Sequence, residues 1–103
     1  MALHFHKLIV TDIRQETKDC VSITFEIPVE LKNDFRFSHG QNLTIKFYAD
    51  EEIRRSYSIC SSPVDNDVRI AIKKVHNGTF STYANEKLKA GDVLDVMPPT
   101  GTF

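Results

Sequence analysis

A period of two in the placement of apolar residues is the feature of this sequence that most restricts its fold. Because successive side chains of a β-strand point to opposite faces of a sheet, alternation of apolar and polar residues predicts strands with one buried face. The segments that show this pattern, the last three of them less regularly, are residues 21–27, 43–48, 68–73, 8–13, 53–60 and 93–97. The sequence therefore predicts an all-β protein built from six strands.

The links between these segments are short and polar, which favours antiparallel pairing of consecutive strands. Residues 16–19, 50–52 and 63–67 are turn clusters of this kind. Closing such a sheet into a barrel also removes exposed strand edges. We therefore expect a six-stranded antiparallel Greek-key barrel. Residues 98–103, which begin with two prolines, have the composition of a connector that follows the last strand.

One segment departs from the period of two and predicts a helix. Apolar residues recur at helical spacing from Phe80 onward. Thr79 or Ser81 offers a hydroxyl for the N-cap, and Gly91 suits the stop. We expect one short helix from about Phe80 to Lys89, directly before the last strand.

Length and charge limit the classes of function. A chain of 103 residues is enough for one domain, residues 1–103. Its 13 Lys and Arg residues against 14 Asp and Glu residues give a net charge of -1, which disfavours binding to nucleic acid or to an anionic membrane surface. No apolar run approaches the roughly 20 residues that span a bilayer. We therefore expect a soluble protein. Cys20 and Cys60 are interpreted as reduced core residues, which favours the cytoplasm.

A first cluster of potential ligand-binding groups lies in residues 54–63, which contain two arginines, a tyrosine and four serines. A guanidinium binds phosphate through paired hydrogen bonds, and an aromatic ring offers a flat face for stacking. The alternation puts Arg55 and Tyr57 on one face and Ser56 and Ser58 on the other, so only a bend or the strand end would let Tyr57 and Ser58 contact one ligand. A solvent-facing polar strand explains this segment equally well on its own.

A second cluster lies in residues 76–82, where a loop that contains Gly78 leads into the predicted helix. Free backbone N–H groups, hydroxyls and the positive end of the helix dipole meet at such a position, which suits an anion such as phosphate. An ordinary helix cap is the simpler explanation of this loop when it is considered alone.

The two clusters together resemble a known family. The run Arg55-Ser56-Tyr57-Ser58, followed by Ser61, is similar to the Arg-x-Tyr-Ser/Thr-x-x-Ser flavin motif of the ferredoxin-NADP reductase superfamily. The run Gly78-Thr79-Phe80-Ser81 resembles the diphosphate-binding motif of that superfamily, and the order and separation of the motifs also match. The resemblance extends over nearly the whole chain, although His39 stands where the family usually has proline.

The resemblance implies an FAD-binding domain of the ferredoxin reductase type. Arg55 would pair with the flavin diphosphate, Tyr57 would lie along the ribityl chain and the isoalloxazine ring, and Ser58 would hydrogen-bond near the redox-active ring nitrogen. Tyr57 and Ser58 are therefore the candidate catalytic residues, and no metal site is expected. Main-chain groups of residues 72–75 would meet the ring or the ribityl chain, and residues 78–82 would hold the diphosphate. The implied cofactor-binding residues are Arg55, Ser56, Tyr57, Ser58, Ile72, Lys74, Val75, Gly78, Thr79, Phe80, Ser81 and Thr82.

The resemblance also implies a role in electron transfer. Family members accept a hydride from NADH or NADPH bound in a separate domain and pass single electrons through FAD to a two-iron, two-sulfur centre and, in some systems, to an oxygenase component. No Gly-rich dinucleotide fingerprint and no Cys-x4-Cys-x2-Cys pattern occurs in the 103 residues, so we expect the NAD(P)-binding and two-iron, two-sulfur domains to be absent. FMN in place of FAD, and a non-catalytic barrel that binds flavin or another ligand, are the alternatives.

Overall fold

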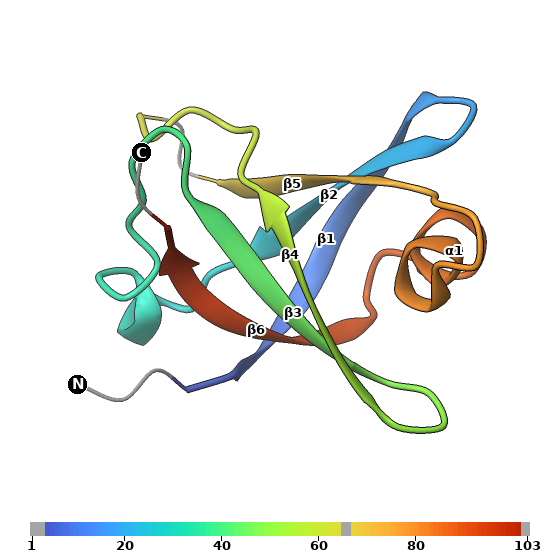
Figure 1. Cartoon of the computed structure of the whole chain (residues 1–103). Helices are drawn as coiled ribbons and strands as arrows, with labels where there is room; N and C mark the ends of the chain where they lie inside the picture. Colours follow the sequence, from blue (N-terminus) through green and yellow to red (C-terminus); the bar gives the residue numbers. More distant parts are fainter. Residues whose placement is uncertain (1–3, 65–66, 102–103) are drawn as a thin grey trace.

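The computed structural model describes residues 4–64 and 67–101 and consists mainly of antiparallel strands (Figure 1). A 3-10 turn, Val29–Leu31, follows the second strand, and the α-helix α1, Thr79–Glu86, precedes the last one. The strands are β1 (His6–Thr17), β2 (Cys20–Glu26), β3 (Asn42–Tyr48), β4 (Glu52–Ser58), β5 (Val68–Lys73) and β6 (Val93–Thr100). The prediction of six strands with a short helix before the last one is confirmed.

The strands form one antiparallel sheet in the order β4-β3-β6-β1-β2-β5. The sheet curls so that its two edge strands, β4 and β5, approach each other (Figure 1). Among the described residues these edges meet at one bridge, Ile59 with Ile70, next to a hydrogen bond from Cys60 N–H to the Arg69 carbonyl (2.8 Å). The antiparallel barrel architecture is thus confirmed, but no continuous ladder closes it, and β4 and β5 diverge beyond this bridge.

The inward-facing residues of the strands form the core, as the alternation predicted. The prediction that Cys20 and Cys60 are core residues is wrong, because Cys60 follows Ile59 on the opposite face and is exposed, and Cys20 is only half-buried. Both thiols are free. The buried strand residues are Leu8, Val10, Val21, Ile23, Phe25, Leu43, Ile45, Val68, Ile70, Ile72, Leu94 and Val96.

Strand β6 is longer than predicted. It runs to Thr100, so the two prolines that we expected in a connector belong to the strand. Thr44 pairs with Met97 and Asn42 pairs with Thr100, so β6 carries one extra residue between these two pairs. Proline has no N–H to give to a ladder and is tolerated at irregularities of this kind. The connector prediction is therefore wrong for this segment, and the last two residues of the chain lie outside the described residues.

Helix α1 begins and ends slightly earlier than predicted. Gly78 is its N-cap residue, and no side chain caps it. The prediction of a hydroxyl cap from Thr79 or Ser81 is therefore wrong. The Ser81 hydroxyl instead accepts a hydrogen bond from Val75 N–H (3.2 Å), which ties the first turn of the helix to the loop before it.

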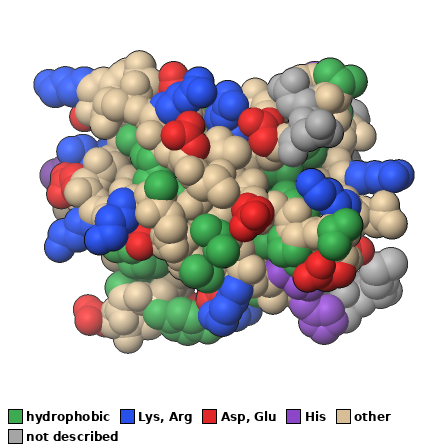
Figure 2. All heavy atoms as spheres, turned by 180° about the vertical axis from the view of Figure 1, so that it is seen from behind, with side chains coloured by type: hydrophobic (Ala, Val, Ile, Leu, Met, Phe, Trp, Pro, Cys, Tyr) green, Lys and Arg blue, Asp and Glu red, His purple; other side chains and the backbone are tan. Residues whose placement is uncertain are grey.

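The surface carries both signs of charge. Figure 2 shows the face opposite to that of Figure 1, where Lys and Arg side chains lie among Asp and Glu side chains. This face has no large field of one sign, in keeping with the net charge of -1. Among residues 4–64 and 67–101, no helix has the length and the apolar content that crossing a membrane requires.

Candidate functional site

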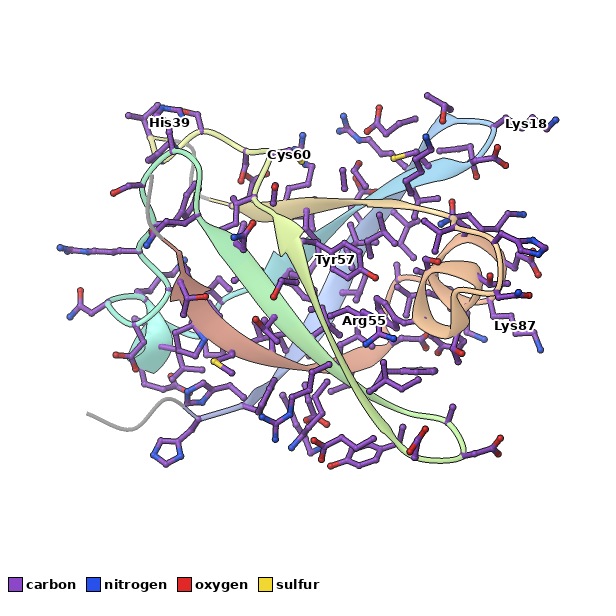
Figure 3. The ribbon with its side chains drawn as sticks, in the orientation of Figure 1. Lys18, His39, Arg55, Tyr57, Cys60 and Lys87 are labelled. Atoms are coloured by element: carbon purple, nitrogen blue, oxygen red, sulfur yellow. The ribbon has the colours of Figure 1, made fainter. Side chains whose placement is uncertain are left out.

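A hollow of about 200 Å³ opens where β4 and β5 diverge and α1 begins. Figure 3 shows Arg55 and Tyr57 on β4, on the side that faces α1. We call this space the β4–α1 hollow, and its lining residues are Arg55, Ser56, Tyr57, Lys73, Val75, Gly78, Thr79, Phe80 and Ser81. It therefore brings together residues from both sequence clusters, although residues 64–75 separate the clusters in the chain.

The register of β3 and β4 explains why Arg55 and Tyr57 face the hollow. Arg55 pairs with Ile45 and Tyr57 pairs with Leu43, so both share the face of buried core residues. The Tyr57 ring packs against Phe80 of α1, with 5.9 Å between ring centroids. Burial raises the pKa of the Tyr57 phenol, and the nearby Arg55 guanidinium partly offsets this effect. Tyr57 therefore stays a neutral hydrogen-bond donor throughout the physiological pH range.

The Arg55 guanidinium is available for an anion. It donates one hydrogen bond, from Nη1 to the Arg54 carbonyl (2.8 Å), and it forms no ion pair within the part of the chain that the structure describes. The neighbouring Arg54 differs, because it lies on the other face of β4 and pairs with Glu52 (2.8 Å). The two adjacent arginines thus have different partners and opposite orientations.

The start of α1 supplies backbone donors on the opposite side of the hollow. The Thr82 N–H makes the first i to i−4 hydrogen bond, to the Gly78 carbonyl (3.1 Å), so the N–H groups of residues 79–81 precede the hydrogen-bonded ladder. The Gly78 N–H donates to the Val75 carbonyl (3.0 Å), which folds the loop back toward β5. These donors and the helix dipole favour negative charge here.

Gly78 has no room for a larger side chain. A Cβ atom at this position would lie 2.4 Å from Ser81 Oγ and 2.5 Å from Val75 Cγ2. Both contacts are closer than nonbonded atoms tolerate, so one of the neighbouring side chains would have to move. Moving the Ser81 hydroxyl would break its hydrogen bond with Val75 N–H. Glycine therefore allows the close approach of loop and helix that shapes the hollow.

We expect Gly78→Ala to lower the free energy of unfolding by about 1–3 kcal/mol, the usual cost of overpacking, and to weaken flavin binding. Urea unfolding and flavin titration measure the two effects. Gly91→Ala is the control, because Gly91 has φ +98° with nothing within 4 Å and does not line the hollow. That variant should lose stability through backbone strain and keep its flavin affinity. Equal flavin affinity in Gly78→Ala and the unchanged protein would show that the hollow does not depend on this contact.

Four of the predicted site residues do not line the hollow. Ile72 is fully buried, and its carbonyl accepts a hydrogen bond from Asn85 Nδ2 (3.1 Å). Lys74 pairs with Glu86 (3.2 Å) and, like Thr82, lines a neighbouring space. Ser58 lies on the other face of β4, where its hydroxyl donates to Asn42 Oδ1 (3.3 Å). The roles assigned to these four residues stay predictions, and Tyr57 and Ser58 face opposite sides of β4, as the alternation indicated.

Two residues that line or support the hollow did not stand out in the sequence. Lys73 was interpreted as a solvated strand residue, yet it lines the hollow. Asn85 donates from Nδ2 to the carbonyls of Ile72 (3.1 Å) and Ser81 (2.8 Å) and so fastens α1 to β5. The spacing of four positions between Ser81 and Asn85 was a usable signal, because it puts both on one face of the helix.

Comparisons with known proteins show the family to which the chain belongs. A family model described as an oxidoreductase FAD-binding domain matches residues 7–103. The chain is 45% identical over 100 residues to a subunit of 1,2-phenylacetyl-CoA epoxidase from Escherichia coli (strain K12), with 96% of this chain and 28% of that protein covered. It is 34% identical over 99 residues to the ferredoxin reductase component of 3-ketosteroid-9-alpha-monooxygenase from Rhodococcus rhodochrous, with 93% and 28% covered.

A solved structure extends the comparison to the fold. Phthalate dioxygenase reductase, described as a modular structure for electron transfer from pyridine nucleotides to a 2Fe-2S centre, matches with a TM-score of 0.78 and 26% identity over 96% of this chain and 30% of that chain. The chain thus spans less than a third of the length of each of these three proteins. By its family match and its two relatives at more than 30% identity, the chain belongs to the oxidoreductase FAD-binding domains of the ferredoxin-NADP reductase superfamily.

Proposed function

We propose that this domain holds FAD with the diphosphate in the β4–α1 hollow, between Arg55 and the start of α1. One observation carries the proposal: the Arg55 guanidinium, which forms no ion pair with any described residue, lies across one space from the backbone donors of residues 79–81. Gly78 keeps that space open, since a Cβ there would meet Ser81 and Val75. The hollow, at about 200 Å³, is smaller than the roughly 300–1,000 Å³ of pockets that enclose drug-sized ligands. It therefore suits one part of a dinucleotide.

The residues around the hollow have distinct roles in this proposal. Arg55 forms paired hydrogen bonds with the diphosphate, and the N–H groups of residues 79–81 and the Ser81 hydroxyl complete its binding. Tyr57 lies against the isoalloxazine ring and, being protonated, donates a hydrogen bond from its phenol. Ser58, which is the last residue of β4, hydrogen-bonds near the redox-active nitrogen of the ring.

The remaining predicted residues act through their main chains or at the edge of the site. Ser56 and Val75 border the flavin, and Lys73 adds positive charge at its rim. The flavin is also contacted, through the backbone or from the neighbouring space, by Ile72, Lys74 and Thr82. Flavin supplies the conversion of a two-electron hydride transfer into single-electron steps, and the protein positions it and excludes water from part of its surface.

We extend the proposal to the electron-transfer chain of which this domain forms a part. Reduced nicotinamide is the electron donor, and an iron-sulfur centre and an oxygenase component are the acceptors. The support is the kind of protein to which the chain is similar: a component of an epoxidase, a monooxygenase reductase component and a dioxygenase reductase. The 45% identity to the phenylacetyl-CoA epoxidase component favours a role in phenylacetate or aromatic degradation. Two free cysteines favour the cytoplasm as the location.

Flavin titration of an Arg55→Ala variant tests the proposal. Loss of a charge-assisted hydrogen-bond pair costs about 1.5–3 kcal/mol, so FAD affinity should fall about 10- to 150-fold. Arg55→Lys should recover only part of the affinity, because lysine keeps the charge and loses the planar fork. Isothermal titration with FAD measures each affinity.

Arg54→Ala is the matched control, because it removes the same charge from the neighbouring position on the other face of β4. Its FAD affinity should stay within a few-fold of that of the unchanged protein. Equal affinities in the Arg55→Ala variant and the unchanged protein would remove Arg55 from the site. Failure of the unchanged protein to bind FAD or FMN would favour a barrel for another ligand.

A further inference from the structure

A second hollow of about 200 Å³ lies at the end of the barrel away from α1, between the segment that joins β2 to β3 and the segment before β5. In Figure 1 the β2–β3 segment lies at the left and α1 at the right. We call this space the β2–β5 hollow. Val68, the first residue of β5, lines it, whereas Lys73, the last residue of β5, lines the β4–α1 hollow. A strand of this length covers about 17 Å from its first residue to its last, so the two hollows are separate.

The floor of the β2–β5 hollow is apolar. Its buried residues are Ile27, Phe35 and Val68, and Phe37 adds a half-buried ring. The Phe35 N–H donates to the Leu31 carbonyl (3.1 Å), which closes one helical turn and fixes the backbone at Phe35. A fixed floor with two aromatic residues favours a flat apolar group over a hydrated inorganic anion.

Two cationic side chains lie at the rim of this hollow. Lys32 and Arg36 are exposed and line it from positions four residues apart on the β2–β3 segment. Neither forms an ion pair with any residue of 4–64 or 67–101. The acids of the same segment, Glu30 and Asp34, do not line the hollow. An arginine and a lysine beside an apolar floor favour a carboxylate, which a guanidinium binds through two parallel hydrogen bonds.

The acid in the lining of the hollow, Asp67, already has a cationic partner. Its Oδ2 atom pairs with Arg69 Nη2 (3.1 Å). The Ser61 hydroxyl donates to the Asp67 carbonyl (3.2 Å) and accepts a hydrogen bond from the Arg69 N–H (3.1 Å), so this wall is fixed without a ligand. The rim of the hollow therefore keeps a positive charge, although the net charge of the chain is -1.

We propose that the β2–β5 hollow binds a small aromatic carboxylate, with its ring on the apolar floor beside Phe37 and its carboxylate on Arg36 and Lys32. The volume admits a ligand of one ring, because pockets that enclose drug-sized ligands measure roughly 300–1,000 Å³. This second site is independent of the proposed FAD site, since no residue lines both hollows. Failure of FAD binding and failure of carboxylate binding are therefore distinguishable.

Benzoate is the probe that tests this site. In an NMR titration of the 103-residue chain, the backbone amide shifts should be largest at residues 35–37 and 67–68 and should saturate at millimolar benzoate. Benzamide has the same ring without the charge, and acetate has the charge without the ring. Each should bind about 10-fold more weakly than benzoate, because each loses one of the two kinds of contact.

Two variants test the cationic rim. Lys32→Gln and Arg36→Gln should each lower benzoate affinity about 5- to 10-fold, a modest loss because both side chains are exposed. Lys18→Gln and Arg14→Gln are the matched controls, since each removes the same charge from an exposed residue that does not line the hollow. Lys18 lies at the β1–β2 turn (Figure 3), and Arg14 lies on β1. The controls should keep the benzoate affinity of the unchanged protein.

Saturable binding with shifts at the β2–β5 hollow, weakened in the Lys32 and Arg36 variants and not in the controls, would support the site. Equal benzoate affinity in all four variants would overturn it, and so would benzamide binding as tightly as benzoate. Absence of saturation would also overturn it. Shifts confined to residues 55–57 and 78–81 would do the same, because the carboxylate would then bind in the β4–α1 hollow.

Discussion

The FAD-loaded chain is expected to be reduced readily by dithionite or light, but slowly and without saturation by NADH or NADPH. The 103 residues contain no Gly-x-Gly-x-x-Gly fingerprint for a dinucleotide, and they span less than a third of the relatives that use pyridine nucleotides or belong to oxygenase systems. Alignment of hydride donor and acceptor contributes roughly 7–11 kcal/mol to catalysis in well-oriented systems. We propose that these residues form no nicotinamide site, in which case that contribution is missing and binding of the cofactor and its turnover should separate.

Stopped-flow absorbance at increasing NADH concentration measures this separation. The observed rate should rise linearly and stay close to that of free FAD at the same concentration. Free FAD is the control, because it has the same chemistry with no protein to align the donor. Rapid bleaching that saturates with NADH would mean that these residues form their own nicotinamide site. In that case the expectation that a separate domain binds the nicotinamide would be wrong for this chain.

The strands were predictable because their signal is local. In β5 the alternation of Val68, Ile70 and Ile72 with polar or small residues gives the observed bounds, Val68–Lys73. In such a strand the polarity of each residue indicates whether its side chain faces the core or the solvent. The two prolines of β6 gave no local signal that they belong to a strand, because the irregularity that accommodates them depends on the pairing of β6 with β3. Pairing between distant segments leaves a weaker trace in the sequence than alternation does.

The gap between β4 and β5 could not be predicted from the alternation for the same reason. The two strands meet at Ile59 and Ile70, and beyond that point Phe80 of α1 packs against Tyr57 and Phe47. A helix therefore covers the core where a closed ladder was expected. The spacing of Phe80 predicted a helix but not the strands against which that helix packs.

The sequence predicted those parts of the candidate site whose ligand-binding groups lie within a few residues of one another in a single motif. Arg55 and Tyr57 share a strand face, and Gly78 immediately precedes α1. Lys73 and Asn85 were missed because their positions depend on how α1 packs against β5. The resemblance to a family predicted that the two motifs form one site, and residues of both motifs line the β4–α1 hollow.

Phe80→Ala is expected to lower the free energy of unfolding by about 3–5 kcal/mol and to weaken flavin binding. Loss of a buried phenylalanine removes apolar contacts and leaves a cavity, and costs of this size are usual for the substitution. Phe80 is 2% exposed, packs against the rings of Tyr57, Phe47 and Tyr83 and lines the β4–α1 hollow, so the cavity would open beside the proposed flavin site. Urea unfolding followed by circular dichroism measures the stability.

Phe35→Ala is the matched control for a general loss of stability. Phe35 is 3% exposed and lies in the loop after the 3-10 turn, where its ring contacts His6 and does not line the β4–α1 hollow. It should lose comparable stability and keep its flavin affinity when measured under conditions where the protein is folded. Domains of this size have about 5–15 kcal/mol of stability, so Phe80→Leu, which leaves a smaller cavity, provides a folded variant if Phe80→Ala does not. Equal flavin affinities in the Phe80 and Phe35 variants would mean that Phe80 stabilises the core without shaping the site. A fall confined to the Phe80 variants would instead tie the packing of α1 to the position of Tyr57, and hence to the binding of the cofactor.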